Sequence, residues 1–119
     1  LTEYSRRYDG FTALSKERLA LFELFIDELE SSQTKLELFL TPLHPKLKTD
    51  LEATTSARER REELIETLED ILGPRDIEVA DFTNIESYGG DPSAFYDGVH
   101  FKRTEATKII SALLEDENL

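Results

Sequence analysis

Apolar residues recur at helical spacing in three segments of the chain. The first runs from about residue 16 to Ser31, with Ser15 as the predicted N-cap, and its broad stripe suits a helix laid on a sheet. The second follows Ser56-Ala57-Arg58-Glu59, which has the pattern of a capping box, and stops at Gly73-Pro74. The third spans about Thr104 to Leu114. The stripe of the first segment comprises Leu19, Leu21, Phe22, Phe25, Ile26 and Leu29, whereas Leu24 falls off it.

Two short apolar runs lie between these helices and predict strands. Lys35–Leu40 is followed by Pro42 and has the composition of a strand buried on both faces, as in a parallel sheet. Ile77–Phe82 is the second run. Residues 46–55 fit either a short separate helix or the first turns of the next one, and residues 1–12 have no clear period.

The predicted order is helix, strand, helix, strand, helix, which favours parallel strands joined by a helical crossover. We therefore expect an α/β fold, a partial flavodoxin-like three-layer arrangement, with residues 1–119 forming a single domain or a domain fragment. Two parallel strands alone make a poor sheet. We expect the edge of strand 35–40 to pair beyond this chain, either with further strands of a longer protein or with a second copy in a homodimer.

Composition narrows the classes of partner. The chain has 26 acidic against 14 basic residues, a formal charge of −12, which argues against nucleic acid and anionic membranes as partners. Without cysteine there is no disulfide, no thiolate metal site and no cysteine nucleophile. No apolar run approaches the length of a membrane span, and no signal peptide is visible. The chain starts at Leu1 and lacks methionine, so we expect a processed product or a piece of a longer protein.

The main candidate for chemistry is the pair Asp97 and His100, three residues apart around Gly98 in a long loop before the last helix. A carboxylate can accept one ring N–H of a histidine, fix its tautomer and leave the other ring nitrogen as a general base. We predict a heavy-atom distance of about 2.6–3.2 Å between the two side chains. The alternative is that Asp97 only shapes the loop and His100 is a surface residue.

Two further residues, His44 and Asp81, carry weaker signals. His44, between two prolines at the end of the first strand, is a candidate substrate-binding residue or a structural histidine of a rigid turn. Asp81 ends the second strand and is more typical of a loop cap. These residues with Asp97 and His100 lack metal-ligand spacing, so we expect no metal and no cofactor. No serine lies in a Gly-Asp-Ser or Gly-x-Ser-x-Gly context.

The run Phe95-Tyr96-Asp97-Gly98-Val99-His100, followed by a terminal helix, resembles the last conserved block of the SGNH (GDSL-like) hydrolases. Leu38-Phe39-Leu40-Thr41-Pro42-Leu43-His44-Pro45 resembles the penultimate strand in the branch of DltD-like proteins and polysaccharide O-acetyltransferases. The chain is similar to the part of that fold after its third block. Phe101 stands where many members have proline, and the Gly-Asp-Ser nucleophile, oxyanion glycine and block-three asparagine have no counterpart.

The resemblance implies a serine esterase or O-acyltransferase in which His100 is the base and Asp97 orients it, with the nucleophilic serine supplied by upstream sequence. It implies an acyl ester as substrate, carbohydrate-linked by analogy. We predict that the 119-residue chain alone has no significant esterase activity, because it holds no positioned nucleophile and no oxyanion hole. The rival hypothesis is a non-catalytic acidic α/β interaction module that pairs through its sheet edge. The compartment is left open.

Overall fold

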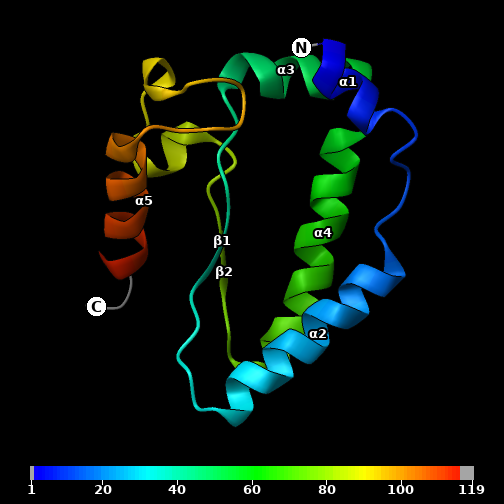
Figure 1. Ribbon diagram of the computed structural model, residues 1–119, viewed down its shortest axis with the longest axis vertical. Coiled ribbons are helices and arrows are strands. Elements are labelled where there is room, and N and C mark those ends of the chain that lie inside the picture. The colour runs from blue at the N-terminus through cyan, green and yellow to red at the C-terminus, as the bar shows by residue number, and fades with distance from the viewer. Residues whose placement is uncertain (1, 116–119) are drawn as a thin grey trace.

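The computed structural model describes residues 2–115, which form a mixed helix-and-strand fold around a small parallel sheet (Figure 1). The helices are α1 (Thr2–Tyr8), α2 (Lys16–Ser31), α3 (Pro45–Thr54), α4 (Ala57–Leu72) and α5 (Arg103–Glu115). The strands are β1 (Leu38–Leu40) and β2 (Val79–Asp81), and short 3-10 helices occur at η1 (Gly73–Arg75), η2 (Ile85–Tyr88) and η3 (Pro92–Ala94).

The three predicted helices are confirmed, but one predicted cap is wrong. The Ser15 hydroxyl accepts a hydrogen bond from the Arg18 N–H at 3.2 Å and begins α2 as expected. Ser56 is the N-cap residue of α4, yet its hydroxyl makes no capping bond and donates instead to the Phe11 carbonyl at 2.8 Å. The Thr55 hydroxyl accepts from the Ala57 N–H at 3.2 Å in its place. The capping box therefore does not form, because the segment before α2 occupies the serine.

Helices α1 and α3 were not part of the predicted order. Residues 46–55 prove to be a separate helix, since Pro45 starts α3 and the His44 ring nitrogen Nδ1 accepts the Lys46 N–H at 3.1 Å. Helix α1 has no apolar period of its own and packs against α3, so tertiary contact rather than local pattern accounts for it. The prediction of five alternating elements was therefore wrong in count, although its strand–helix–strand part is confirmed.

The sheet has two parallel strands in the register Leu38↔Val79, Phe39↔Ala80 and Leu40↔Asp81. The predicted parallel pairing is confirmed, but both strands are shorter than their apolar runs. All three residues of β1 are half-buried, so the expectation of a strand buried on both faces was wrong. In Figure 1, α2 and α4 lie on one side of the strands, whereas α5 lies on the other side near their carboxyl ends. Helix α5 packs mainly against η2, which leaves β1 incompletely covered.

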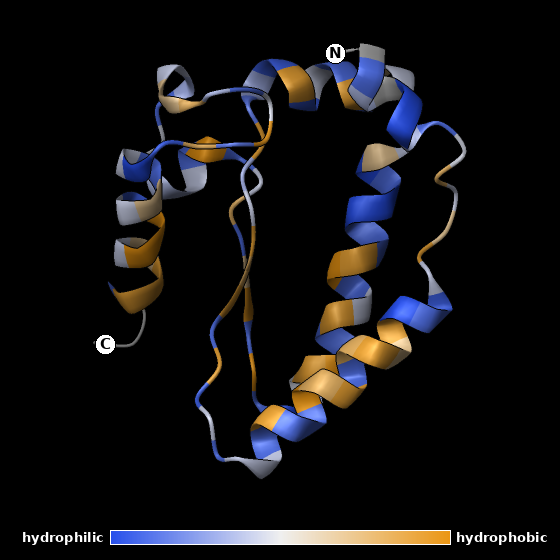
Figure 2. Ribbon diagram, in the orientation of Figure 1, coloured by the Kyte–Doolittle hydropathy of each residue, from blue (hydrophilic) through white to orange (hydrophobic). Residues whose placement is uncertain are grey.

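The core lies where α2, α4 and the start of the strands meet. Ile26, Leu68 and Leu72 form its buried centre, with half-buried side chains around them. Helix α2 contributes Ile26 together with its neighbours one turn away, whereas Leu21 and Phe25 are 65% and 57% exposed. The predicted stripe was therefore too broad, because α4 covers only one strip of α2 and leaves the adjacent apolar strip in solvent. Figure 2 shows this apolar colouring continuing along α2.

The described chain is less compact than a typical globular domain of its length. Its radius of gyration is 15.5 Å, whereas a compact chain of this length should have roughly 13.5 Å. Its extents are 42 × 33 × 19 Å, so it is a thin slab. Among the helices that the structure describes, none has the length and apolarity needed to traverse a bilayer.

Candidate functional site

The loop after β2 ends in a small antiparallel hairpin that presents Asp97 and His100. Phe95 and Phe101 pair across it as an isolated bridge, with their ring centroids 6.5 Å apart in an edge arrangement. The Tyr96 N–H donates to the His100 carbonyl at 2.8 Å, and the Lys102 N–H donates to the Ala94 carbonyl at 2.9 Å. The two candidate residues therefore occupy the tip of a hydrogen-bonded turn.

The Asp97 carboxylate contacts His100 through one oxygen and shapes the turn through the other. Its Oδ2 lies 2.7 Å from His100 Nδ1, which confirms the predicted hydrogen-bond distance. Its Oδ1 accepts the backbone N–H groups of Val99 and His100, both at 2.8 Å. The side chain thus performs the loop-shaping role and the histidine-orienting role at the same time, and the two interpretations do not exclude each other.

These hydrogen bonds favour the ionised form of Asp97. The Val99 N–H, the His100 ring and the His100 N–H, in that order, lower the pKa of Asp97 from 3.8 to about 2. A carboxylate accepts hydrogen bonds but cannot donate, so Nδ1 of His100 carries the proton in this contact. The neutral tautomer then has its lone pair on Nε2. The imidazole side chain is 71% exposed, which leaves Nε2 accessible to solvent.

The turn is fixed to the end of β1 through Gly98. The Gly98 carbonyl accepts the His44 N–H at 2.9 Å, and a side chain at Gly98 would collide with the fully buried Leu47. The His44 ring also meets the Phe95 ring edge-on at 5.7 Å. The two predicted site regions, after β1 and after β2, therefore lie together at the carboxyl ends of the parallel strands, where α/β sheets bind ligands.

His44 itself lies beside the turn as a helix cap. Its Nδ1 accepts the Lys46 N–H, so the ring has a structural function at the start of α3. The Asp81 carboxylate accepts from the backbone N–H of buried Thr83 at 3.0 Å and from its hydroxyl at 2.5 Å, which fits the predicted loop cap. In the described part of the chain, neither side chain forms a hydrogen bond or an ion pair with the side chain of Asp97 or of His100. Within residues 2–115, no three histidine, aspartate or glutamate side chains gather where they could hold a metal ion.

The hydroxyl groups of the loop serines, Ser87 and Ser93, donate to residues other than His100. The Ser87 hydroxyl donates to the Asn84 carbonyl at 2.6 Å, and the Ser93 hydroxyl donates to the Asp91 carboxylate at 2.8 Å. Both hydroxyls are thus used within their own turns. Within residues 2–115, the His100 imidazole forms its side-chain hydrogen bond with Asp97.

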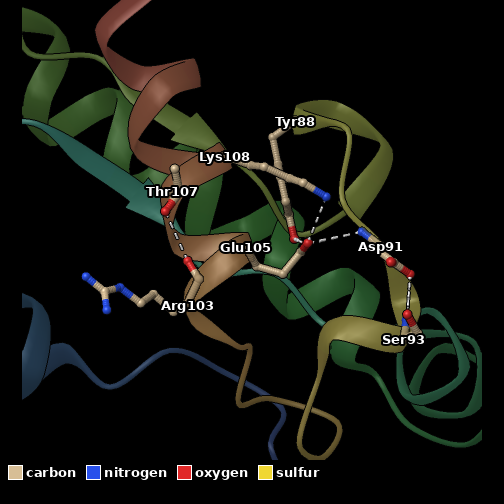
Figure 3. Close-up of polar contacts among 7 residues, drawn as sticks. All are labelled: Tyr88, Asp91, Ser93, Arg103, Glu105, Thr107 and Lys108. Atoms are coloured by element: carbon tan, nitrogen blue, oxygen red, sulfur yellow. Dashed lines mark hydrogen bonds and ion pairs between the residues drawn. The ribbon is translucent and has the colours of Figure 1, made fainter.

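A buried carboxylate that the sequence patterns missed anchors this loop to α5. Glu105 is fully buried and accepts the Tyr88 hydroxyl at 2.9 Å, the Asp91 N–H at 3.2 Å and the Lys108 ammonium at 3.1 Å (Figure 3). Burial, and then the hydrogen bond to Glu105, raises the pKa of the Tyr88 hydroxyl. Acidic residues in a first helical turn ordinarily face solvent, so the sequence held no signal of this burial.

Glu105 also explains a glycine in the loop. A Cβ at Gly90 would lie 2.7 Å from Glu105 Oε2 and 2.8 Å from the Ile85 Cβ. The backbone at Gly90 therefore approaches the carboxylate more closely than any other residue would allow. Asp91 fixes the next part of the loop. Its carboxylate accepts the Ser93 N–H at 2.9 Å and caps η3, which lies directly before the hairpin.

Comparison of the chain with protein-family models, with curated proteins and with solved structures found no match. The resemblance to SGNH hydrolases therefore stays a prediction from the residues of the last block.

Proposed function

We propose that Asp97 and His100 are the orienting carboxylate and the general base of a serine esterase or O-acyltransferase of the SGNH type. The chain would be the C-terminal portion of that domain, a partial flavodoxin-like three-layer fold, with the nucleophilic serine on upstream sequence. The observation that carries the proposal is the 2.7 Å contact between Asp97 Oδ2 and His100 Nδ1 beside an accessible Nε2. The acyl ester substrate, carbohydrate-linked by analogy, comes from the family resemblance.

The chemistry follows from the tautomer. Nε2 of His100 takes the serine proton as the serine oxygen attacks the ester carbonyl carbon, and the imidazolium returns that proton to the departing alkoxide oxygen. Asp97 stabilises the imidazolium between these steps. Because the pKa of Asp97 is lowered to about 2, the carboxylate stays ionised throughout the neutral range. An oxyanion hole, which is often the largest electrostatic contribution, would come from the same upstream sequence as the serine.

Two assays test the proposal. The 119-residue chain should not turn over p-nitrophenyl acetate, whereas a protein joined to its upstream Gly-Asp-Ser segment should. In that longer protein, His100→Ala should lower the rate by about 10³-fold or more, and Asp97→Asn by a similar order, since the wrong tautomer then dominates. Turnover by the 119-residue chain that is lost in both His100→Ala and one Ser→Ala variant would place the nucleophile inside the chain and overturn the division of the triad.

A second candidate function is an interaction module that pairs through its sheet edge. It is favoured by the half-buried β1 and by the two-stranded sheet of the described residues. In that case Asp97 and His100 only shape a turn, and no Gly-Asp-Ser segment precedes Leu1 in the gene. The upstream gene sequence therefore separates the two candidates. Such a module could form a homodimer through β1, and sedimentation of the chain over a dilution series would detect that dimer.

A further inference from the structure

A pocket of about 210 Å³ gathers positive charge in this acidic chain. It lies at the carboxyl end of β1, where α1, α3 and the start of α4 meet (Figure 1). Among the described residues that line it, Glu52 has the one carboxylate, and the remaining walls are mainly apolar, with Phe11, Leu43 and Leu64 among them. The basic side chains that line it are Lys48, Arg58, Arg60 and Arg61. The pocket thus combines four cations with apolar walls, although the whole chain has a formal charge of −12.

Three of these cations are mostly buried and outnumber their partners. The side chains of Lys48, Arg60 and Arg61 are each less than a quarter exposed. Glu52 Oε1 lies 2.8 Å from Lys48 Nζ and 3.4 Å from Arg61 Nη2, so one carboxylate serves two cations. Glu63 Oε2 lies 3.2 Å from Arg60 Nε. A mostly buried positive charge without a matching anion is unfavourable. Within residues 2–115, the recorded ion pairs of these three cations therefore fall one negative charge short of balance.

The Nε atom of Arg60 lacks a hydrogen bond. It is one of two buried side-chain polar atoms of the described residues in this condition, and the other, Glu52 Oε1, lines the same pocket. Although Glu63 is close, the Arg60 Nε–H does not point at its carboxylate, whose Oε1 accepts the Leu14 N–H at 3.3 Å. Buried polar groups in proteins are normally paired, and an exception calls for a specific explanation. An acceptor that enters the pocket would supply the missing partner.

The positions of the arginines also run against local helix preference. Arg58, Arg60 and Arg61 lie in the first turns of α4, where the positive end of the helix dipole disfavours cations. Sequences break such local rules mainly at functional sites. The contact with Lys48, and then the charges of Lys48, Arg61 and Arg58, lower the pKa of Glu52. The surroundings of the pocket therefore stabilise negative charge.

We infer that this pocket binds a small monocarboxylate with a short aliphatic chain. The carboxylate would accept hydrogen bonds from Arg60, because a planar guanidinium group matches a carboxylate. The chain would lie against the apolar walls. A deficit of one negative charge suits a monoanion better than a phosphate dianion. The volume is below the range of about 300–1,000 Å³ that is typical for drug-sized ligands, so the chain is short. The inference does not depend on any chemistry at His100.

The test titrates hexanoate into the nitrogen-15-labelled 119-residue chain. The amide resonances of Leu43 and Leu64, which line the pocket, should shift and saturate, whereas the resonance of buried Ile109 on α5 should not move. Two further probes separate charge from chain. 1-Hexanol has the chain without the charge, and inorganic phosphate has the charge without the chain. Each should bind at least about tenfold more weakly than hexanoate.

Two substitutions change the charge of the pocket in opposite directions. Arg60→Gln removes the unpaired donor and one positive charge, and should weaken hexanoate binding about tenfold or more. Glu52→Gln releases Lys48 and Arg61 from their shared carboxylate and should strengthen binding about threefold or more. The control Arg103→Gln removes the same charge at an exposed residue of α5 and should change the affinity by less than about twofold. Stronger binding cannot result from misfolding, so Glu52→Gln decides alone if Arg60→Gln does not fold.

Three results would overturn the inference. The first is 1-hexanol binding as tightly as hexanoate, because the cations would then play no part. The second is phosphate binding as tightly as hexanoate, because the apolar walls would then be irrelevant. The third is the absence of saturable shifts, or an equal affinity in Arg60→Gln and Arg103→Gln, because the cations of the pocket would then serve only as partners of the glutamates on α3 and α4.

Discussion

Replacement of Glu105 should loosen the whole segment between β2 and α5. The side chain is fully buried and accepts hydrogen bonds from three donors on three parts of the chain. Glu105→Ala removes the hydrogen bonds that the carboxylate accepts from the half-buried Tyr88 hydroxyl and from the Asp91 N–H. A hydrogen bond to a charged group contributes about 1.5–3 kcal/mol. The Lys108 side chain is 40% exposed, so its ammonium can return to water at small cost. We expect a loss of about 4 kcal/mol in the free energy of unfolding.

Glu105→Gln is the more informative replacement. The amide keeps one carbonyl oxygen of similar size but loses the charge, and hydrogen bonds to charged groups are worth about 1.5–3 kcal/mol each. We expect the free energy of unfolding to fall by about 2 kcal/mol, so that the glutamine variant is intermediate in stability between the native chain and the alanine variant. The matched control is Glu115→Gln, which is the same substitution at an exposed residue of the same helix. Its effect should stay within about 0.5 kcal/mol.

Urea unfolding followed by far-ultraviolet circular dichroism measures these differences. With a slope of about 2 kcal/mol per molar urea, the alanine variant should lower the midpoint by about 2 M and the glutamine variant by about 1 M. Near-native midpoints for both variants would refute the reasoning, because the buried carboxylate would then contribute nothing net. Equal losses in both variants would mean that charge, rather than the count of acceptors, determines the effect.

Three further predictions concern the same loop. Gly90→Ala should lower the free energy of unfolding by about 1–3 kcal/mol, as measured with urea, because its Cβ would lie 2.7 Å from Glu105 Oε2. The control Gly73→Ala has open space around its Cβ and should be neutral or slightly stabilising. Equal effects of the two substitutions would contradict the close contact at Gly90. The pKa of Asp97 is depressed in the fold, so the order of its turn should be complete above about pH 4 and lost as the pH falls through about 2. The amide resonances of Val99 and His100 report this order. A turn that is unchanged at pH 2 would contradict the prediction. The pKa of Tyr88 is raised in the fold, so its contribution to stability should be complete below about pH 10 and decline above it. Tyrosinate absorbance should show one late-titrating tyrosine, which should be missing in Tyr88→Phe. Early titration of all tyrosines would contradict the burial of Tyr88.

The sequence predicted the elements whose signals are local. The cap at Ser15, the stop at Gly73-Pro74 and the contact between Asp97 and His100 each depend on residues within one or two turns of each other. These signals survive folding because no distant segment competes for the same groups. The Asp97 turn is the clearest case, since both of its backbone donors lie within three residues of the carboxylate.

The errors lie where distant segments meet. The Ser56 hydroxyl bonds to Phe11, 45 residues away, and so the capping box fails. Leu21 and Phe25 belong to an apolar stripe that nothing in residues 2–115 covers, so periodicity overstated their burial. Glu105 is buried because the donors of Tyr88 and Asp91 converge on it from a loop with no period. Such features depend on tertiary placement, which pattern and propensity do not encode.

The register of the sheet has a consequence for how the chain folds. Leu38 and Val79 are 41 positions apart (79 − 38), and both α3 and α4 lie between them. Closing that span costs chain entropy before any strand pairing repays it, so the sheet should form after the two helices and open before them. The His44–Gly98 bond ties the turn of Asp97 and His100 to the end of β1. The histidine should therefore gain and lose its fixed position in the same opening event as the strands, while α4 remains helical.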